Sequence, residues 1–179
     1  MASTTPLLPA PRRITASNLP LSASDAPSVK AEPAVEVLDD TLNLEPILGG
    51  SLARARLATH KKIPTSNDGS GNIPLDDVPG SGIVLPNGLN MYYLDVAPKT
   101  EGVMHRTTST DYLIVLQGTL SLLTPEHSFD AETGLSNRTD QWVRVVAIVA
   151  SSDPNRVPVE QDASSTPQEL RVLDDAWLA

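Results

Sequence analysis

Three side chains near the middle of the chain have the types and the spacing that catalysis uses. His105, Arg106 and Asp111 lie within one short polar stretch. An imidazole and a carboxylate can exchange protons with a bound molecule, and a guanidinium can anchor a carboxylate or an enolate. The sequence therefore predicts His105, Asp111 and Arg106 as catalytic candidates.

Each of these side chains also has a structural interpretation. Asp111 could accept hydrogen bonds from loop N–H groups, and His105 could bond to Tyr112 or to the backbone. Arg106 could be a surface arginine of an acidic protein. In the catalytic interpretation, His105 and Asp111 form an organic acid–base pair, while Arg106 and the hydroxyls of residues 107–110 orient a ligand oxygen. The residue types leave both interpretations open.

Residues 90–124 have the pattern of strands and turns that would hold these side chains. The patterns at residues 91–96 and 111–116 predict two strands. A turn is predicted at Gly118, followed by a strand over residues 119–123 that pairs with residues 111–116 as a hairpin. The candidate side chains would then lie on the loop between the first two strands and at the start of the second strand.

Further strands are predicted on both sides of this stretch. The run QWVRVVAIVA at residues 141–150 is the strongest strand pattern in the chain, and residues 34–38 also alternate. Residues 51–60 fit either a short helix or a strand, because their period does not decide between the two. Short strands, glycine-marked turns and little helical periodicity predict an all-β fold, either a sandwich or a barrel.

The two ends of the chain differ in composition from its centre. Prolines recur among Ser, Thr and Ala in residues 1–35, which predicts an irregular Pro-rich arm. Residues 36–150 form the predicted β domain. Residues 151–179 form a predicted polar C-terminal tail, in which residues 170–173 could add one edge strand.

Composition removes several classes of function. None of the 179 residues is cysteine, so disulfides, thiolate catalysis and thiolate metal sites are excluded. The net charge of −9 provides no electrostatic footprint for nucleic acid or for an anionic membrane. No apolar run is long enough for a membrane helix, and the N-terminus lacks the pattern of a secretory signal. We therefore expect a soluble, cytoplasmic protein.

The spacing of the central residues resembles the first motif of the cupin superfamily. In that motif a histidine-x-histidine pair is followed by an acidic residue and then by a closing glycine. His105 matches the first histidine, Thr107 stands in place of the second, Asp111 stands at the acidic position, and Gly118 matches the closing glycine. The resemblance implies a single cupin-like jelly roll, also called a double-stranded β-helix.

The stretch MHRTTSTDYLIVLQGTLSLL is similar to the cupin-domain proteins encoded in fungal polyketide gene clusters. The matching positions are Met104, His105, Arg106, Thr107, Ser109, Asp111, Tyr112, Ile114, Val115, Leu116 and Gly118. Weaker similarity extends over most of residues 12–150. The resemblance implies a role in secondary-metabolite biosynthesis.

The second cupin motif is incomplete. Residues 134–142 fit the end of that motif, including its asparagine and tryptophan, but the hairpin and the histidine that precede them have no counterpart. The predicted jelly roll therefore lacks about one hairpin. His127 lies just before the gap and could be either a substitute ligand or a solvated loop histidine.

The resemblance implies two functions. The first is a tailoring enzyme that acts on a polyketide intermediate in the barrel mouth, most simply an oxidoreductase, with a dehydratase or decarboxylase as variants. The second is a non-catalytic small-molecule-binding or accessory protein, which the broken motif favours. The resemblance also implies His105 and Asp111 as ligands of a divalent metal (iron, zinc or manganese). Because this ligand set is incomplete, a bound metal and no cofactor are both open. We expect a small-molecule partner, neither nucleic acid nor membrane, and a homodimer formed through sheet edges.

Overall fold

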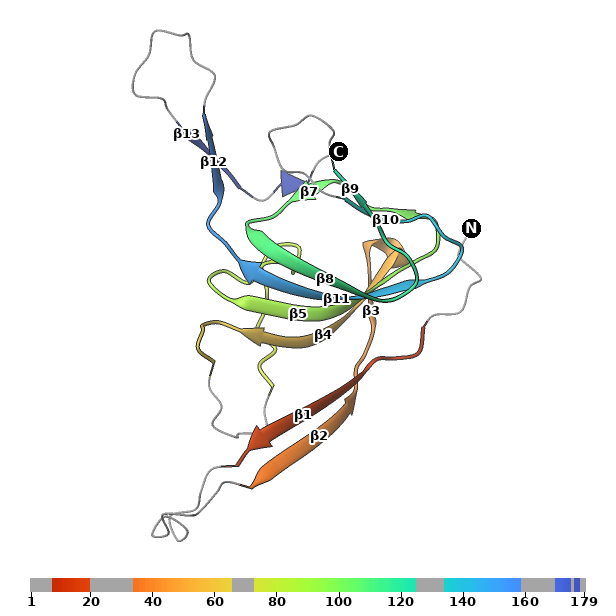
Figure 1. The fold of residues 1–179 in the computed structure, drawn as a ribbon, viewed down its shortest axis with the longest axis vertical. Coiled ribbons are helices and arrows are strands. Elements are labelled where there is room, and N and C mark those ends of the chain that lie inside the picture. Colours follow the sequence, from red (N-terminus) through yellow and green to blue (C-terminus); the bar gives the residue numbers. More distant parts are fainter. Residues whose placement is uncertain are drawn as a thin grey trace.

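The protein is all-β, as the sequence predicts. The structure, a computed structural model, describes residues 8–19, 34–65, 73–124, 134–158, 170–174 and 176–177. Within these residues the regular elements are antiparallel strands and one short 3₁₀ turn at Leu48–Gly50. None of the described residues forms a helix long and apolar enough to cross a membrane. The arrangement is consistent with a sandwich or jelly-roll type of fold (Figure 1).

The strands are numbered in chain order. They are β1 Arg12–Asn18, β2 Val35–Thr41, β3 Glu45–Ile47, β4 Leu52–His60, β5 Leu89–Val96, β6 Thr100–Glu101, β7 His105–Arg106, β8 Ser109–Gln117, β9 Ser121–Leu123, β10 Gly134–Asn137, β11 Val143–Ser151, β12 Asn155–Pro158, β13 Leu170–Leu173 and β14 Ala176–Trp177. The predicted strands over residues 34–38, 91–96, 111–116 and 141–150 correspond to β2, β5, β8 and β11. Residues 51–60 form a strand, β4, rather than a helix.

A five-stranded sheet in the order β3-β4-β5-β11-β8 is the main layer. A smaller sheet in the order β6-β10-β9 lies across from it in Figure 1. The core lies on the face of the main sheet formed by alternate residues of β5 and β11. Cross-strand pairs place Leu94 beside Val145 and Val96 beside Val143, and all four side chains are buried. Burying one such side chain contributes about 1.5–3 kcal/mol.

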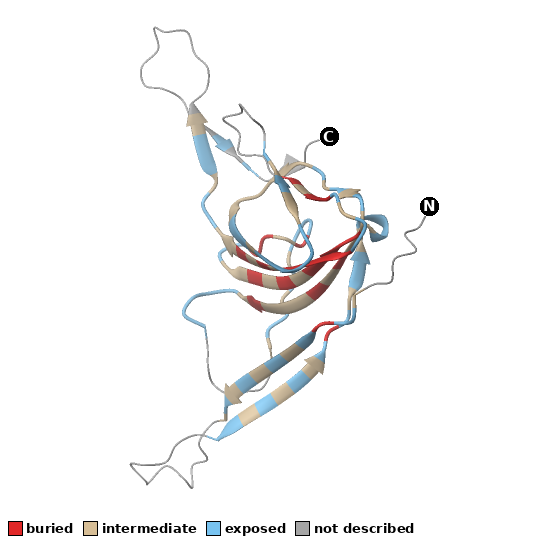
Figure 2. Ribbon diagram, turned by 45° about the vertical axis from the view of Figure 1, so that its right-hand side comes forward, coloured by how far each residue is buried: buried red, intermediate tan, exposed pale blue. Residues whose placement is uncertain are grey.

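Figure 2 shows the same distribution, with buried residues gathered on the main sheet and few on the hairpin of β1 and β2. Ala147 and Val149 continue the buried row along β11. The side of the main sheet that carries this row is called the inner face below. It also carries the polar groups considered as a site.

The predicted hairpin between residues 111–116 and 119–123 is wrong. β8 pairs with β11, whereas β9 pairs with β10 in the smaller sheet. Gly118 has a φ of 82°, and a Cβ added there would lie 2.9 Å from Cγ2 of Val143. The chain therefore turns tightly against the start of β11 and leaves the main sheet at this glycine. Gly118 lies in a turn, as predicted, but this turn connects β8 of the main sheet to β9 of the smaller sheet.

The N-terminal segment contacts the opposite, outer face of the main sheet at Arg144. The carboxylate of Asp95 on β5 accepts two hydrogen bonds from Arg144 on β11, at 2.7 and 2.6 Å. Arg144 also donates to the carbonyl of Pro9 at 2.7 Å. Both side chains of the pair are nearly inaccessible to solvent, at 11% and 0% exposure. The segment before β1 is thus tied to the sheet by a buried guanidinium.

Both predicted terminal segments contain strands. The predicted arm of residues 1–35 includes β1, which pairs along its whole length with β2. This hairpin crosses the predicted boundary at residue 35 and lies on the other side of the main sheet from the small sheet (Figure 1). The predicted tail of residues 151–179 includes β12, β13 and β14. β12 pairs with β13, and β14 pairs with β7.

Candidate functional site

His105 and Arg106 both contact backbone carbonyls. They form the two-residue strand β7, whose partner strand is β14. The Nδ1 atom of His105 lies 3.0 Å from the carbonyl oxygen of Val103. Since a carbonyl can only accept, this contact requires a proton on Nδ1. Nε of Arg106 donates to the carbonyl of Asp174 at 2.9 Å. These contacts fit the structural interpretation of both side chains and leave the catalytic one untested.

Asp111 lies on β8 at the edge of the main sheet. Its register partner on β11 is Val149, which in turn pairs with Asn90 on β5, so the three residues form one row across the inner face. Asp111 is exposed, whereas Asn90 and Val149 are buried. The carboxylate of Asp111 therefore lies at the end of this row, on the edge strand of the main sheet.

Tyr92 lies one row further along the inner face, and the charge of Asp111 affects its pKa. Burial of the phenol and, to a smaller extent, the negative charge of Asp111 raise the pKa of Tyr92 to about 12. The positive charge of Arg54 lowers the same pKa, and the Arg54 guanidinium carbon lies 5.9 Å from the centre of the Tyr92 ring. At neutral pH the phenol therefore keeps its proton and can donate a hydrogen bond.

The structure brings some of the predicted residues together but does not join others. Hydroxyls of Ser109 and Thr107 share a hydrogen bond of 2.8 Å. In the described part of the chain, no hydrogen bond or ion pair connects His105 with Asp111. The described residues also contain no group of three or more His, Asp or Glu side chains placed to hold a metal ion. His127 lies outside the described residues.

The remnant of the second motif forms a structural corner. The Asn137 amide nitrogen, fully buried, donates to the carbonyls of Val96, Ala97 and Gln141 at 2.7–3.0 Å. Its oxygen accepts hydrogen bonds from the backbone N–H and the hydroxyl of Thr139. Asn137 thus links the end of β5 to the turn before β11.

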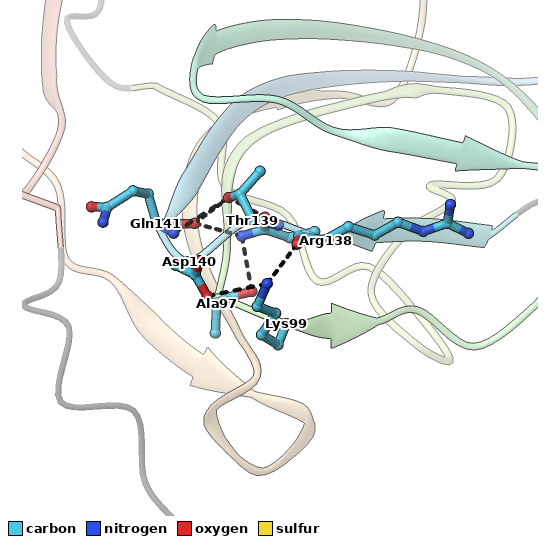
Figure 3. Close-up of polar contacts among 7 residues, drawn as sticks. Ala97, Lys99, Arg138, Thr139, Asp140 and Gln141 are labelled. Atoms are coloured by element: carbon cyan, nitrogen blue, oxygen red, sulfur yellow. Dashed lines mark hydrogen bonds and ion pairs between the residues drawn. The ribbon is translucent and has the colours of Figure 1, made fainter.

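Lys99 contacts the same turn before β11, as Figure 3 shows. Its ammonium group donates to the carbonyl of Arg138 at 2.9 Å and lies 3.1 Å from the carboxylate of Asp140. The region that the resemblance assigns to the second motif therefore holds two strands in place through its asparagine.

A polar cavity lies on the inner face near the β3 and β4 edge of the main sheet, which is the edge opposite to Asp111 on β8. Its volume is about 310 Å³. The residues that line it are Glu45, Arg54, Arg56, Asp77, Val78, Gly82 and Asn90. They come from β3, β4, β5 and the loop that precedes β5. Two guanidinium groups and two carboxylates therefore face one small space.

Arg54 is held against the loop but keeps one donor unsatisfied. Nη1 of Arg54 donates to the carbonyl of Gly82 at 2.9 Å. Gly82 has a φ of 75°, and a Cβ added there would lie 2.5 Å from Nη1 of Arg54, so a side chain at residue 82 would require the guanidinium to move. Nε of Arg54 is buried and has no hydrogen-bond partner in the described residues. An unsatisfied buried donor costs about 1–3 kcal/mol, which a ligand acceptor could offset.

Arg56 lies two residues further along β4 and shares the face of Arg54. Nη2 of Arg56 donates to the carbonyl of Asp76. The Asp76 carboxylate accepts a hydrogen bond from Thr59 at 3.0 Å and pairs with Lys61 at 2.6 Å. These contacts fix the start of the loop that forms one wall of the cavity.

The prediction from sequence missed the two cavity arginines. The run LARARL at residues 52–57 could have indicated them, because a strand places alternate residues, such as these two arginines, on one face. That signal has no meaning until residues 51–60 are known to be a strand, and the sequence left this open.

Comparison with known proteins adds no family assignment. No protein-family model matches the chain, and no curated protein matches its sequence.

Proposed function

We propose that this chain is a cupin-like small-molecule-binding protein that serves, as a tailoring or accessory protein, in the biosynthesis of a polyketide. The observation that carries the proposal is the cavity of about 310 Å³ with Arg54 and Arg56 in its wall. This volume lies at the lower end of the range for small-molecule sites. In this proposal the protein works in the cytoplasm.

The chemistry of the wall points to an acidic ligand that also carries hydroxyl groups. Arg54 retains a buried Nε–H without a partner, and guanidinium groups favour carboxylate or enolate oxygens. The carboxylates of Glu45 and Asp77 can accept hydrogen bonds from ligand hydroxyls and disfavour a second negative charge on the ligand. A monoanionic, hydroxylated polyketide acid satisfies both requirements.

Arg54 is a better anchor for such a ligand than Arg106. The Nε of Arg106 already donates to a backbone carbonyl, whereas the Nε of Arg54 does not. The buried Tyr92 phenol lies below the Arg54 guanidinium and keeps its proton at neutral pH.

Calorimetric titration with salicylate, a small aromatic hydroxy acid, tests this proposal. We expect saturable binding by the wild-type protein and at least about a tenfold weaker affinity for Arg54→Met, equal to about 1.4 kcal/mol. Arg54→Lys should retain part of the affinity, because it keeps the positive charge.

Arg12→Met is the matched control, since Arg12 lies on the exposed hairpin and pairs with Asp39. It should bind salicylate as the wild type does. Circular dichroism checks that each variant is folded. Failure of the wild type to bind salicylate, or equal binding by folded Arg54→Met, would contradict the assignment of this cavity as an acid-binding site.

The second candidate is a tailoring oxidoreductase that uses His105, Asp111 and Arg106. The observation in its favour is that Asp111 lies on the inner face, close enough for its charge to raise the pKa of Tyr92. The described residues do not form a metal-ligand set, so no step is assigned to a metal. Elemental analysis of the purified protein tests this candidate. Stoichiometric iron, zinc or manganese that is lost in His105→Ala supports it, and equal metal content in both proteins counts against it.

A further inference from the structure

We propose that the free edge of β8 binds the same edge of a second copy of this chain, so that the protein is a symmetric dimer. β8 is the last strand of the main sheet, and in the described residues its ladder partner is β11. Its other edge presents backbone N–H and C=O groups along nine residues. Such an edge is a template for pairing with another strand. This inference is independent of the proposed ligand.

The exposed edge of β8 is apolar on the outer face. Tyr112 and Ile114 share this face and have exposed fractions of 58% and 50%, and Leu116, at the register shift, is 54% exposed. Val115, on the inner face, is also exposed, at 46%. A group of neighbouring large apolar side chains at a strand edge marks an interaction surface.

The opposite edge of the main sheet is protected by short length, charge and proline, whereas β8 lacks this combination and is irregular only near Leu116, where its register with β11 shifts. The other end strand, β3, has three residues, and these include Glu45 and Pro46. Short length, charge and proline all prevent edge pairing. β8 has three times that length, contains no proline, and carries Asp111 as its single charged residue. The contrast indicates that this edge has a partner.

A second copy fits this edge better than an unrelated strand because β8 is complementary to itself. A twofold axis through Leu113 pairs all nine residues of β8 with the same residues in antiparallel order. Tyr112 of each copy then lies opposite Ile114 of the other, which is a favourable cross-strand pair. Asp111 lies opposite Val115, so the two carboxylates do not oppose each other. An acidic chain of net charge −9 can therefore associate here without opposing like charges in the ladder.

Pairing would also close the open side of the inner face. Asp111, Leu113 and Val115 are the β8 residues that share the face of Val145, Ala147 and Val149. A second copy of β8 would extend this surface across the dimer and cover its present edge.

Sedimentation equilibrium over a wide range of concentrations tests the proposal. We expect the wild-type protein to have twice the 19.0 kDa mass of one chain. Ile114→Lys should shift the mass to that of the monomer. Ile14→Lys, at an equally exposed strand position on β1 (60%), should remain a dimer. A monomeric wild type would overturn the proposal, as would a dimer that Ile14→Lys dissociates and Ile114→Lys does not.

A cysteine variant locates the interface, even if Ile114→Lys fails to fold. The chain has no cysteine, and directly opposed residues of an antiparallel pair have Cα atoms about 4.5–5.5 Å apart, which a disulfide can span. Leu113→Cys should form a covalent dimer under mild oxidation, while Ile14→Cys should not. Equal cross-linking of both variants, or cross-linking of Ile14→Cys alone, would contradict an interface at β8.

Discussion

Two arginines on opposite faces of the main sheet differ in how completely their guanidinium donors are paired. On the outer face, Arg144 makes two short bonds to the buried carboxylate of Asp95 and a third to a backbone carbonyl. On the inner face, Arg54 bonds to carbonyls of the loop beside the cavity and keeps a buried Nε–H unpartnered. The fully paired guanidinium secures the fold. The incompletely paired one leaves a donor for a ligand.

The largest effect should come from breaking the outer pair. Asp95→Ala leaves Arg144 as an uncompensated charge at a site with little solvent, and such losses cost about 3–5 kcal/mol. Thermal unfolding followed by circular dichroism should show a large fall in Tm. Arg54→Met should lower the Tm much less, because it removes an arginine that faces a cavity.

The control for the outer pair is the double variant Asp95→Leu/Arg144→Met. It replaces both charges with apolar groups of similar size and should recover much of the stability lost in Asp95→Ala. If Asp95→Ala and Arg54→Met lower the Tm equally, the distinction between a fully paired, structural Arg144 and an incompletely paired Arg54 is wrong.

The sequence predicts the strand that carries Arg144 but does not predict the ion-pair partner of this arginine. The strand of Arg144 was predicted because its run of Val, Ile and Ala is typical of a buried strand. Nothing in that run indicates that Asp95, far away in the chain, is the partner of its single charge. Arg54 lies in a segment whose period fitted a helix as well as a strand, so the face it shares with Arg56 could not be assigned.

Pairing between distant segments is the information that local patterns lack. Gly118 was correctly predicted as a turn, but its backbone conformation sends the chain into the second sheet, where β9 pairs with β10. The cavity likewise depends on a loop that folds back on β4. The all-β class follows from alternation and turn residues alone, whereas the sheet order and the cavity follow from contacts distant in sequence.

A smaller effect should appear as a dependence of stability on high pH. Burial raises the pKa of Tyr92 to about 12, while an unfolded tyrosine titrates near 10. Between these values the unfolded chain binds fewer protons than the folded one. The stability contributed by Tyr92 is therefore complete below about pH 10 and falls by up to about 1.4 kcal/mol per pH unit until about pH 12.

Denaturant unfolding at pH 9 to 12 checks this dependence, with Tyr92→Phe as the control that should flatten it. The variant Arg54→Met tests whether the inner guanidinium acts on this phenol. Because the Arg54 charge lowers the Tyr92 pKa, its removal should raise that pKa further and shift the phenol absorbance titration to higher pH. An unchanged titration would mean that the inner guanidinium does not act on the phenol.

The smallest effect should come from an arginine that is paired but exposed. Arg12 on β1 makes two hydrogen bonds to Asp39 on β2, at 2.7 and 2.5 Å, which is the same bidentate geometry as Arg144 and Asp95. Both side chains are more than half exposed, at 65% and 52%, so water competes with the pair and salt screens it. The hydrogen bond from Arg12 lowers the pKa of Asp39, which means that the contribution of the pair is present above the unfolded pKa and is lost as the pH falls through the folded one. Asp39→Asn should therefore leave the Tm at neutral pH almost unchanged, and added salt should remove the remaining difference. A fall in Tm as large as that of Asp95→Ala would show that geometry, rather than burial, decides how much an arginine pair stabilises this fold.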